Sequence, residues 1–389
     1  MSKALRFGIV AGESSGDNLG AGLIRALRAH YPNAEFVGIA GPEMLKLGCR
    51  TLAPLDRLSV MGFVEPLGRL PELFRIKRQL HSEFVANPPA AFIGIDAPAF
   101  NLRLEEPLRQ HAVKTVQYVS PSVWAHGKNR IHKIKRAVDL MLTLFPFETA
   151  IYEEHGIAVE CVGHPLADSI GFEDQKAESR AQLDLALADE VVALMPGSRG
   201  GEIKRLGPVF FAAAVEALQH CPQLKFIIPC SSASARSQIT GLLRSASIFP
   251  GDQFVLVDDS HQAISAADFV VLASGTATLE TMLLRRPMVV CYKLGALTYA
   301  IGSRIVKIPN VALPNLLAGK RLVPEFLQNE VTIERVRDEI VSFMAGQTNH
   351  EALLDEFDAI HRSIRLDASS RAAEAILRLL DLPINPDRG

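Results

Sequence analysis

Short runs of apolar residues alternate with segments of helical periodicity along the first half of the chain. The runs are rich in Val, Ile and Phe, which is typical of strands buried on both faces. They are Arg6–Ala11, Glu35–Ile39, Ala91–Ile95, Val113–Val119, Leu140–Phe145 and Val159–Val162. Between the first two runs, Leu19, Leu23, Ile24 and Leu27 recur at helical spacing. This alternation predicts a parallel sheet with helices on both faces.

The alternation then stops and starts again. Residues Gly171–Ala188 are charged, Ala-rich and only weakly periodic, and we interpret them as the connection between two halves. The strands predicted in the second half are Val191–Met195, Lys225–Pro229, Phe254–Val257, Phe269–Ala273 and Met288–Cys291. We therefore predict an α/β protein of two Rossmann-like parallel-sheet domains that face each other across a ligand-binding cleft.

The predicted domains are residues 1–168 and 169–345, followed by a helical tail, residues 346–389. After Val331 only helical patterns remain. Because the tail has no strand of its own to cover, we expect it to pack back across the halves or against a second subunit, as in a homodimer.

Composition narrows the class of protein. The chain has 389 residues, of which 48% are apolar and 22% charged, and its net charge is −2. This balance excludes a disordered or fibrous chain, and no overall positive charge draws the protein to nucleic acid. The longest segments without charge, Thr115–Gly127 and Ile308–Gly319, are too short to span a bilayer. The N-terminal apolar run Phe7–Ala11 is too short for a secretory signal.

Cysteine usage points to a reducing compartment. The five cysteines are odd in number and widely spaced, and no C-x-x-C pair occurs. This pattern favours neither a disulfide framework nor a zinc site and predicts a cytoplasmic protein. No D-x-D triplet and no His/Cys/carboxylate cluster with ligand spacing occurs either, so we predict no metal and no cofactor.

The first predicted strand ends in a Gly-punctuated turn, Gly12–Gly20, that leads into a helix. The free backbone N–H groups of a helix N-terminus favour an anion or a sugar hydroxyl, so Glu13 and Ser14 are candidate binding residues. The spacing fits neither G-x-G-x-x-G nor the phosphate-binding P-loop. An ordinary capped turn remains the alternative.

Asp96 follows the apolar strand Ala91–Ile95 and precedes Pro98. A carboxylate at this strand end is partly desolvated, which raises its pKa toward that of a useful general base. A cap for the helix that begins near Pro98 is the other interpretation, and the two are compatible.

A run of cations, Lys128–Arg136, contains Lys128, Arg130, Lys133, Lys135 and Arg136 together with His132. It suits a phosphate group, although a charge run on a helix is by default its solvated face. The interleaved aromatic residues of a single-strand nucleic-acid platform are missing, so we predict no nucleic-acid partner.

The second half repeats the design of a strand, a Gly-rich loop and a helix. Pro196–Glu202 places Arg199 among three glycines at a strand end, where a guanidinium can hold phosphate oxygens. A structural surface arginine is the alternative.

A further loop, Leu272–Glu280, carries Ser274, Gly275 and Thr276 at the start of a helix. Glu280 lies one helical turn after Thr276, where it can accept hydrogen bonds from a ribose diol. A capping box is the alternative for Thr276 and Glu280.

Residues Val60–Arg78 combine large apolar side chains with four cations. Such a segment can lie in a lipid interface with its cations on anionic headgroups, or it can be an amphipathic helix that faces its own core. The candidate membrane-facing residues are Val60, Met61, Phe63, Leu67, Leu70, Leu73 and Phe74.

Nine segments together resemble the lipid-A-disaccharide synthase family, glycosyltransferase family 19 of the GT-B superfamily. They are Gly12–Asp17 (GESSGD), Gly94–Asn101 (GIDAPAFN), Val119–Ala125 (VSPSVWA), Phe145–Glu148 (FPFE), Gly163–Pro165 (GHP), Pro196–Glu202 (PGSRGGE), Ala273–Glu280 (ASGTATLE), Pro287–Tyr292 (PMVVCY) and Leu313–Gly319 (LPNLLAG). They occur in the family's order over nearly the whole chain. One position departs, because Ala99 stands where the family commonly has the second Asp of DAPDFN.

The resemblance implies an inverting transfer of 2,3-diacylglucosamine from its UDP derivative to the 6-hydroxyl of 2,3-diacylglucosamine 1-phosphate. The products are a β-1,6-linked disaccharide precursor of lipid A and UDP. By the same resemblance Asp96 is the base, Arg199 neutralises the diphosphate, Glu280 binds the ribose and Asn315 lines the nucleotide side. The family also implies a cytoplasmic enzyme held peripherally on the inner-membrane lipid surface.

Two other hypotheses stay open at this point. A UDP-N-acetylglucosamine epimerase of the GT-B type shares the predicted fold but needs no lipid-facing surface. A binding protein without catalytic activity would use the basic segment His126–Arg136 to hold nucleic acid or anionic lipid.

Overall fold

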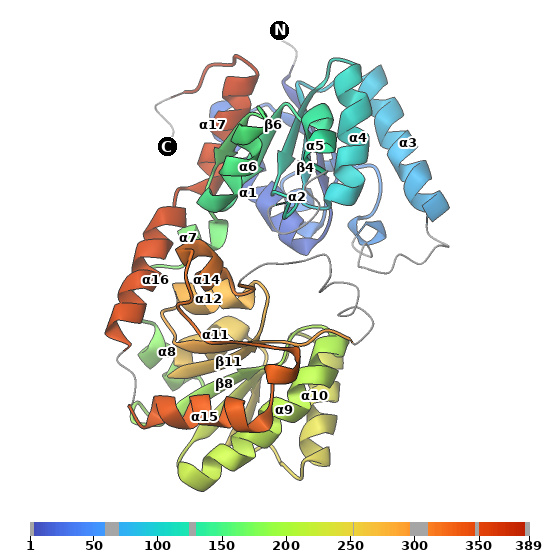
Figure 1. Cartoon of the computed structure of the whole chain (residues 1–389). Coiled ribbons are helices and arrows are strands. Elements are labelled where there is room, and N and C mark those ends of the chain that lie inside the picture. The colour runs from blue at the N-terminus through green and yellow to red at the C-terminus, as the bar shows by residue number, and fades with distance from the viewer. Residues whose placement is uncertain are drawn as a thin grey trace. The chain divides into compact units, whose positions relative to one another are not determined.

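A computed structural model describes residues 4–58, 70–123, 130–251, 253–295, 310–346 and 350–385. The chain divides into two compact units (Figure 1). The N-terminal unit comprises residues 1–168 and 363–389, and the C-terminal unit comprises residues 169–362. Each unit is built on one sheet flanked by helices, so the prediction of two parallel-sheet, Rossmann-like domains is confirmed.

The sheet of the N-terminal unit has seven strands in the order β3-β2-β1-β4-β5-β6-β7. All of its strand pairs are parallel. The strands are β1 (Arg6–Ala11), β2 (Glu35–Ile39), β3 (Arg50–Thr51), β4 (Ala91–Ile95), β5 (Lys114–Tyr118), β6 (Leu140–Thr143) and β7 (Val159–Cys161). The strand order reverses direction between β1 and β4, and ligands of such sheets bind at the carboxyl ends of strands at this switch point.

The helices of this unit include α1 (Ser14–His30), α2 (Pro42–Lys46), α3 (Leu70–Ala86), α4 (Pro98–Gln110), α5 (Arg130–Ala137), α6 (Thr149–Glu154), α7 (Pro165–Ser169) and α17 (Ala368–Leu379). Short 3-10 turns occur at η1 (Leu55–Arg57) and η3 (Pro146–Glu148). On one side of the sheet, Val10 and Phe92 pack in one cluster with Phe84 of α3 and Leu104 of α4. Apolar residues at helical spacing thus fix α3 and α4 against the sheet.

The sheet of the C-terminal unit has six parallel strands in the order β10-β9-β8-β11-β12-β13. The strands are β8 (Val191–Met195), β9 (Lys225–Pro229), β10 (Phe254–Val257), β11 (Phe269–Ala273), β12 (Met288–Tyr292) and β13 (Glu325–Leu327). Here the order reverses between β8 and β11. The carboxyl ends of these two strands lead into the two Gly-containing loops that the sequence analysis selected.

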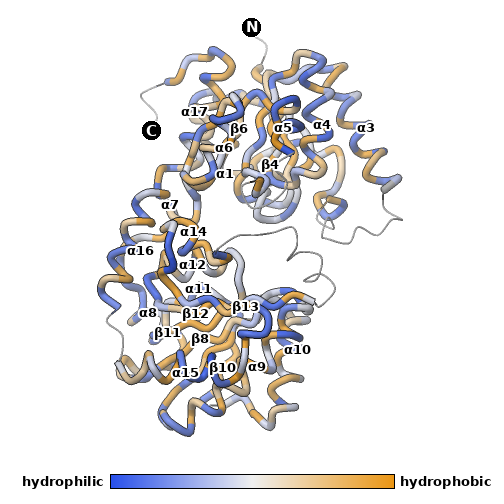
Figure 2. The backbone as a smooth tube through the Cα atoms, viewed as in Figure 1, coloured by the Kyte–Doolittle hydropathy of each residue, from blue (hydrophilic) through white to orange (hydrophobic). Residues whose placement is uncertain are grey.

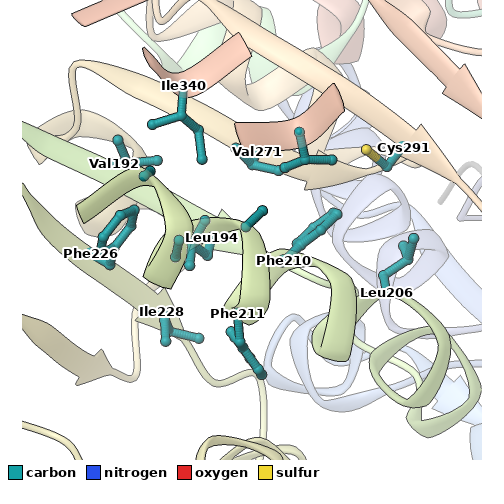
Figure 3. Close-up of a cluster of buried hydrophobic side chains, with 14 of the residues drawn as sticks. Val192, Leu194, Leu206, Phe210, Phe211, Phe226, Ile228, Val271, Cys291 and Ile340 are labelled. Carbon is teal, nitrogen blue, oxygen red and sulfur yellow. The ribbon is translucent and has the colours of Figure 1, made fainter. Parts of the chain in front are cut away.

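The described helices of this unit are α8 (Lys176–Gln182), α9 (Gly200–His220), α10 (Ala233–Ser245), α11 (Ser260–Ala266), α12 (Ala277–Leu283), α14 (Leu313–Ala318), α15 (Ile333–Met344) and α16 (Glu351–Ile364), with a 3-10 turn at η4 (Gln328–Glu330). The last two residues of α16 belong to the N-terminal unit. Strands β8 and β11 are continuous hydrophobic segments (Figure 2). Figure 3 shows Phe210 and Phe211 of α9 packed in one buried cluster with Val192, Leu194 and Val271 of the sheet. This core holds the start of α9 at the end of β8.

Two of the strands in the described ranges were not predicted. Strand β3 consists of Arg50 and Thr51, which are both exposed, and β13 begins with the charged Glu325. Both lie at a sheet edge and are two or three residues long. Strands this short carry no apolar run, so only their pairing partners define them.

The C-terminal helix α17 packs against α1 of the same chain. The carboxylate of Asp168 accepts hydrogen bonds from the backbone N–H groups of Asp367 (2.9 Å) and Ala368 (2.7 Å), which start α17. Close contact with α1 occurs at Gly22, where a Cβ atom would lie 2.4 Å from the Ser369 hydroxyl oxygen. The last turn is held because Arg378 donates to both carboxylate oxygens of Glu160, each at 2.8 Å.

Candidate active site

The turn after β1 places Glu13 at the N-cap of α1 and Ser14 at its first helical position, and both residues are exposed. The Ser15 hydroxyl donates to the Glu13 carboxylate at 2.9 Å. Asp17 of the same motif is buried and accepts from three backbone N–H groups at the start of α2, those of Gly41, Glu43 and Met44. The motif therefore has an exposed polar end, Glu13 and Ser14, and a structural end, Asp17.

Gly12 brings the turns after β1 and β4 into contact. A Cβ atom at Gly12 would lie 2.2 Å from the Cβ atom of Ala97, so any side chain at this position would collide with the turn after β4. This close approach places Glu13 beside Asp96. Burial, and secondarily the negative charge of Glu13, raise the pKa of Asp96, while the Ala97 N–H group opposes the rise.

Asp96 has a strained backbone. Its φ is +53° and that of Ala97 is +40°, in the left-handed region that non-Gly residues rarely adopt. The Asp96 N–H group donates to the Tyr118 carbonyl oxygen at 2.9 Å, and the Asp96 carbonyl oxygen accepts from the side-chain amide of Asn101 at 2.8 Å. Helix α4 has Ala97 as its N-cap, so Asp96 does not occupy the capping position that was its alternative interpretation.

In the C-terminal unit, β8 leads through Pro196–Arg199 into the 21-residue helix α9. Gly197 has φ +118°, and a Cβ atom there would lie 2.5 Å from a Glu202 carboxylate oxygen, so only glycine fits. Arg199 is the N-cap, and its side chain is 83% exposed with Nη1 3.6 Å from the Glu202 carboxylate. An exposed guanidinium thus lies at the positive end of a long helix, where an anion is stabilised.

Hydrogen bonds at Ser274 and Gly275 fix the loop after β11. The Ser274 hydroxyl donates to the Val311 carbonyl oxygen at 3.1 Å, and the Thr278 hydroxyl donates to the Gly275 carbonyl oxygen at 2.7 Å. Within the described ranges, a Cβ atom at Gly275 would meet nothing within 4 Å. Thr276 is the N-cap of α12 but its side chain makes no capping hydrogen bond, so the capping box proposed for Thr276 and Glu280 does not form.

Glu280 instead contacts His261, a residue that was not among the candidates predicted from the sequence. His261 of α11 lies with Nδ1 3.3 Å from the Glu280 carboxylate and Nε2 3.2 Å from the side-chain oxygen of Gln175. The hydrogen bond to Glu280 raises the pKa of His261. No sequence signal links positions on two separate helices, so only the fold reveals this pair.

Asn315 lies inside the C-terminal unit and is fully buried. Its amide nitrogen donates to the Val323 carbonyl oxygen (3.0 Å) and to the Glu325 carboxylate (2.7 Å). Its amide oxygen accepts from the N–H groups of Leu322 (2.7 Å) and Val323 (2.9 Å). The polar atoms of the Asn315 side chain thus form their hydrogen bonds within the protein, and these bonds hold the LPNLLAG segment in place.

The predicted membrane-facing residues fall into three groups. Val60, Met61, Phe63 and Leu67 lie outside the described residues, as does the side chain of Leu70. Leu73 is half-buried and packs against the core of the N-terminal unit, so it follows the amphipathic-helix alternative. Phe74 is 50% exposed, with the Lys77 ammonium 5.7 Å from its ring centroid. No helix among the described residues is long and apolar enough to cross a bilayer.

The described part of the cation run forms the outer face of α5. Ile131 and Ile134 are buried, whereas Arg136 is exposed and donates to Glu106 of α4 at 2.8 Å. The Lys135 ammonium donates to the His155 carbonyl oxygen at 2.7 Å. This amphipathic arrangement agrees with the solvated-face interpretation.

Comparisons with known proteins agree on the family. The family model for lipid-A-disaccharide synthetase, LpxB, matches residues 7–377. Lipid-A-disaccharide synthase of Pseudomonas aeruginosa (strain UCBPP-PA14) is 49% identical over 382 residues, which cover 98% of this chain and 100% of the relative. The enzyme of the same name from Cellvibrio japonicus is 49% identical over 98% of each chain.

Solved structures share the fold at low sequence identity. The UDP-GlcNAc 2-epimerase of Neisseria meningitidis aligns with a TM-score of 0.65 and 13% identity over 96% of this chain and all of that one. MurG of Acinetobacter baumannii aligns with a TM-score of 0.59 and 13% identity over 97% of this chain and all of that one. The epimerase alternative therefore rests on a shared fold alone, whereas sequence identity over nearly the full length supports the resemblance found from the motifs. The chain belongs to the lipid-A-disaccharide synthase family.

Proposed function

We propose that this glycosyltransferase of lipid A biosynthesis transfers 2,3-diacylglucosamine from its UDP derivative to the 6-hydroxyl of 2,3-diacylglucosamine 1-phosphate, with inversion. The observation that carries the proposal is the pairing of Asp96 with Glu13 at the sheet switch point of a chain from this family. A single inverting displacement needs a base opposite the leaving group and positive charge at the departing diphosphate.

Asp96 is the proposed base. Its partial burial and the neighbouring Glu13 carboxylate make the ionised form a stronger proton acceptor than a free aspartate. The strained backbone, fixed by hydrogen bonds on both sides of the Asp96 residue, supports a preorganised role. Ala99 carries no carboxylate, so Asp96 is the acid of this turn. Glu13 and Ser14 are the proposed acceptor-side contacts.

Arg199 and the N-terminus of α9 are the proposed diphosphate site. As UDP leaves, negative charge builds on the diphosphate. The exposed guanidinium can stabilise this charge by donating two parallel hydrogen bonds to diphosphate oxygens. We assign Ser274, Gly275 and Thr276 to the donor loop and Glu280 to the ribose hydroxyls. We assign to Asn315 the support of the neighbouring segment, because its polar atoms already have partners inside the unit.

The overall proposal is tested by the product formed from acylated donor and acceptor. We expect mass spectrometry to show a tetra-acylated disaccharide 1-phosphate and an equal amount of UDP, with neither formed when one substrate is left out. An enzyme that instead altered unacylated UDP-N-acetylglucosamine without consuming the acceptor would establish the epimerase alternative.

We also propose that the start of α3 contacts the lipid surface from which both substrates are drawn. Phe74 is half-exposed and stands among Arg75, Lys77 and Arg78, an apolar side chain amid cations that suits anionic headgroups.

Phe74→Ser is expected to lower partition onto anionic phospholipid vesicles about tenfold, since one partly inserted Phe contributes on the order of 1.5 kcal/mol. Sedimentation with vesicles measures the bound fraction. Phe249→Ser is the matched control, because Phe249 is 75% exposed but belongs to the C-terminal unit. Equal loss in both variants, or none in Phe74→Ser, would place the attachment elsewhere.

A further inference from the structure

A buried polar cluster lies behind Asp96 in the N-terminal unit. It consists of Asn101 and Glu105 of α4 and Gln117 of β5, and each of these side chains is 0% exposed. Polar groups buried this deeply are costly unless each finds a hydrogen-bond partner. Neither the proposed chemistry nor the packing of the core accounts for Glu105.

Strand register brings the three side chains to one place. Gly94 of β4 lies opposite Gln117 of β5, so the two residues face the same side of the sheet. Gly94 has no side chain, and α4 fills the space: a Cβ atom there would lie 2.4 Å from a Glu105 carboxyl oxygen and 2.9 Å from Cγ of Asn101. The Glu105 carboxyl and the Asn101 amide therefore lie together at Gly94, on the side of the sheet that Gln117 also faces. Helix α4 packs against β4 on this side.

The two amide nitrogens of the cluster hold the loops above it. Asn101 donates to the Asp96 carbonyl oxygen at 2.8 Å, and Gln117 donates to the same oxygen at 3.1 Å and to the Val119 carbonyl oxygen at 3.3 Å. Val119 has φ +81°, which is rare for a β-branched residue. One pair of amides thus ties together two strained loops, one of which carries the proposed base.

The acceptors of the cluster lack a donor. Across the described ranges, Asn101 Oδ1, Gln117 Oε1 and both carboxyl oxygens of Glu105 have no hydrogen-bond partner. Four unpartnered acceptors in this buried cluster repel one another when the carboxyl is ionised. A proton on Glu105 supplies the missing donor, because a neutral carboxyl has one O–H group.

We infer that Glu105 is held protonated and donates its hydroxyl hydrogen to an amide oxygen of Asn101 or Gln117, acting as a positioning residue for Asp96. The hydrogen bond fixes the orientation of the amide that accepts it, with that amide's nitrogen pointing at the Asp96 carbonyl oxygen. Independently, burial raises the pKa of Glu105 well above its ordinary value. The positioning part of the inference rests on the proposed role of Asp96 as the base.

Infrared difference spectroscopy tests the protonation without reference to activity. Subtracting the Glu105→Gln spectrum from that of the full-length protein at neutral pH is expected to show the loss of one protonated carboxylic acid C=O band. Glu106→Gln is the control, since the neighbouring Glu106 forms an ion pair with Arg136 and should yield no such difference. Loss of an ionised carboxylate band in Glu105→Gln would overturn the inference.

Steady-state kinetics with acylated donor and acceptor test the positioning role. Glu105→Gln keeps a donor and is expected to retain kcat within about twofold, whereas Glu105→Leu has none and should lose about tenfold in kcat with donor KM unchanged. A Glu105→Leu variant with full kcat, or a Glu105→Gln variant as impaired as Glu105→Leu, would contradict the role. If Glu105→Leu does not fold, the kcat of Glu105→Gln and the infrared band of the protonated carboxyl still test the inference.

The two proposals fail in different ways. If Asp96→Asn kept full activity, the assignment of Asp96 as the base would be wrong, while the acid band of Glu105 would stand. If the band were missing, the protonation of Glu105 would be wrong whatever the role of Asp96.

Discussion

Asp96→Asn is expected to lower kcat by about 10²- to 10⁴-fold, the contribution typical of a general base, while UDP affinity stays unchanged. The amide has the size of the carboxylate but cannot accept the proton of the acceptor hydroxyl. The proposed diphosphate site lies in the other unit of the chain, so binding of UDP should survive. Product formation and calorimetric titration with UDP measure the two quantities separately.

The pH dependence of the reaction provides a control for this assignment. Because Asp96 must be ionised to act, kcat/KM should rise with pH through its raised pKa. Glu13→Gln removes a neighbouring negative charge, so the pKa of Asp96 falls and this limb of the profile should move to lower pH. If Glu13→Gln left this limb of the kcat/KM profile at the same pH, or if Asp96→Asn turned over normally, another group would have to be the base.

Stability distinguishes loss of chemistry from loss of the fold. The folded state holds the Asp96 proton more tightly than the unfolded state, so stability falls as pH rises from the ordinary carboxyl pKa to the raised one. Asp96→Asn removes this contribution. The variant should therefore unfold no earlier than the parent protein at neutral pH.

Arg199→Ala is expected to weaken UDP binding by about 10- to 100-fold, since hydrogen bonds to charged groups contribute roughly 1.5–3 kcal/mol. The loss should concern the diphosphate, so the affinity for uridine, which lacks phosphates, should change little. Calorimetric titration with UDP and with uridine measures both. Among the described residues, the exposed guanidinium forms a 3.6 Å ion pair with Glu202, which it gives up when the ligand binds.

Two further variants test whether the loss of UDP affinity is specific to the guanidinium of Arg199. Arg199→Lys keeps the charge but not the planar fork, so it should recover part of the affinity. Arg244→Ala removes an exposed arginine from α10 of the same unit and should leave UDP binding unchanged. Unchanged UDP affinity in Arg199→Ala would rule out the diphosphate role.

The two sheets and most of their strands could be predicted from the sequence. Strands buried between helices on both faces consist of uninterrupted apolar runs, as in Val191–Met195, and such runs are visible without a structure. The Gly-containing loops were also predictable, because Gly197 and Gly12 mark places where a side chain would collide. Edge strands β3 and β13 escaped prediction, since they are too short to carry a pattern.

Which polar side chains contact one another became visible only in the fold. Glu13 and Asp96 come together because β1 and β4 are neighbours in the sheet although a helix-rich segment separates them in the chain. Glu280 meets His261 across two helices. Asn315, which the family resemblance assigned to the nucleotide side, is fully buried. Residue patterns reflect local periodicity and burial, whereas contacts between side chains depend on strand order and register, which no local pattern records.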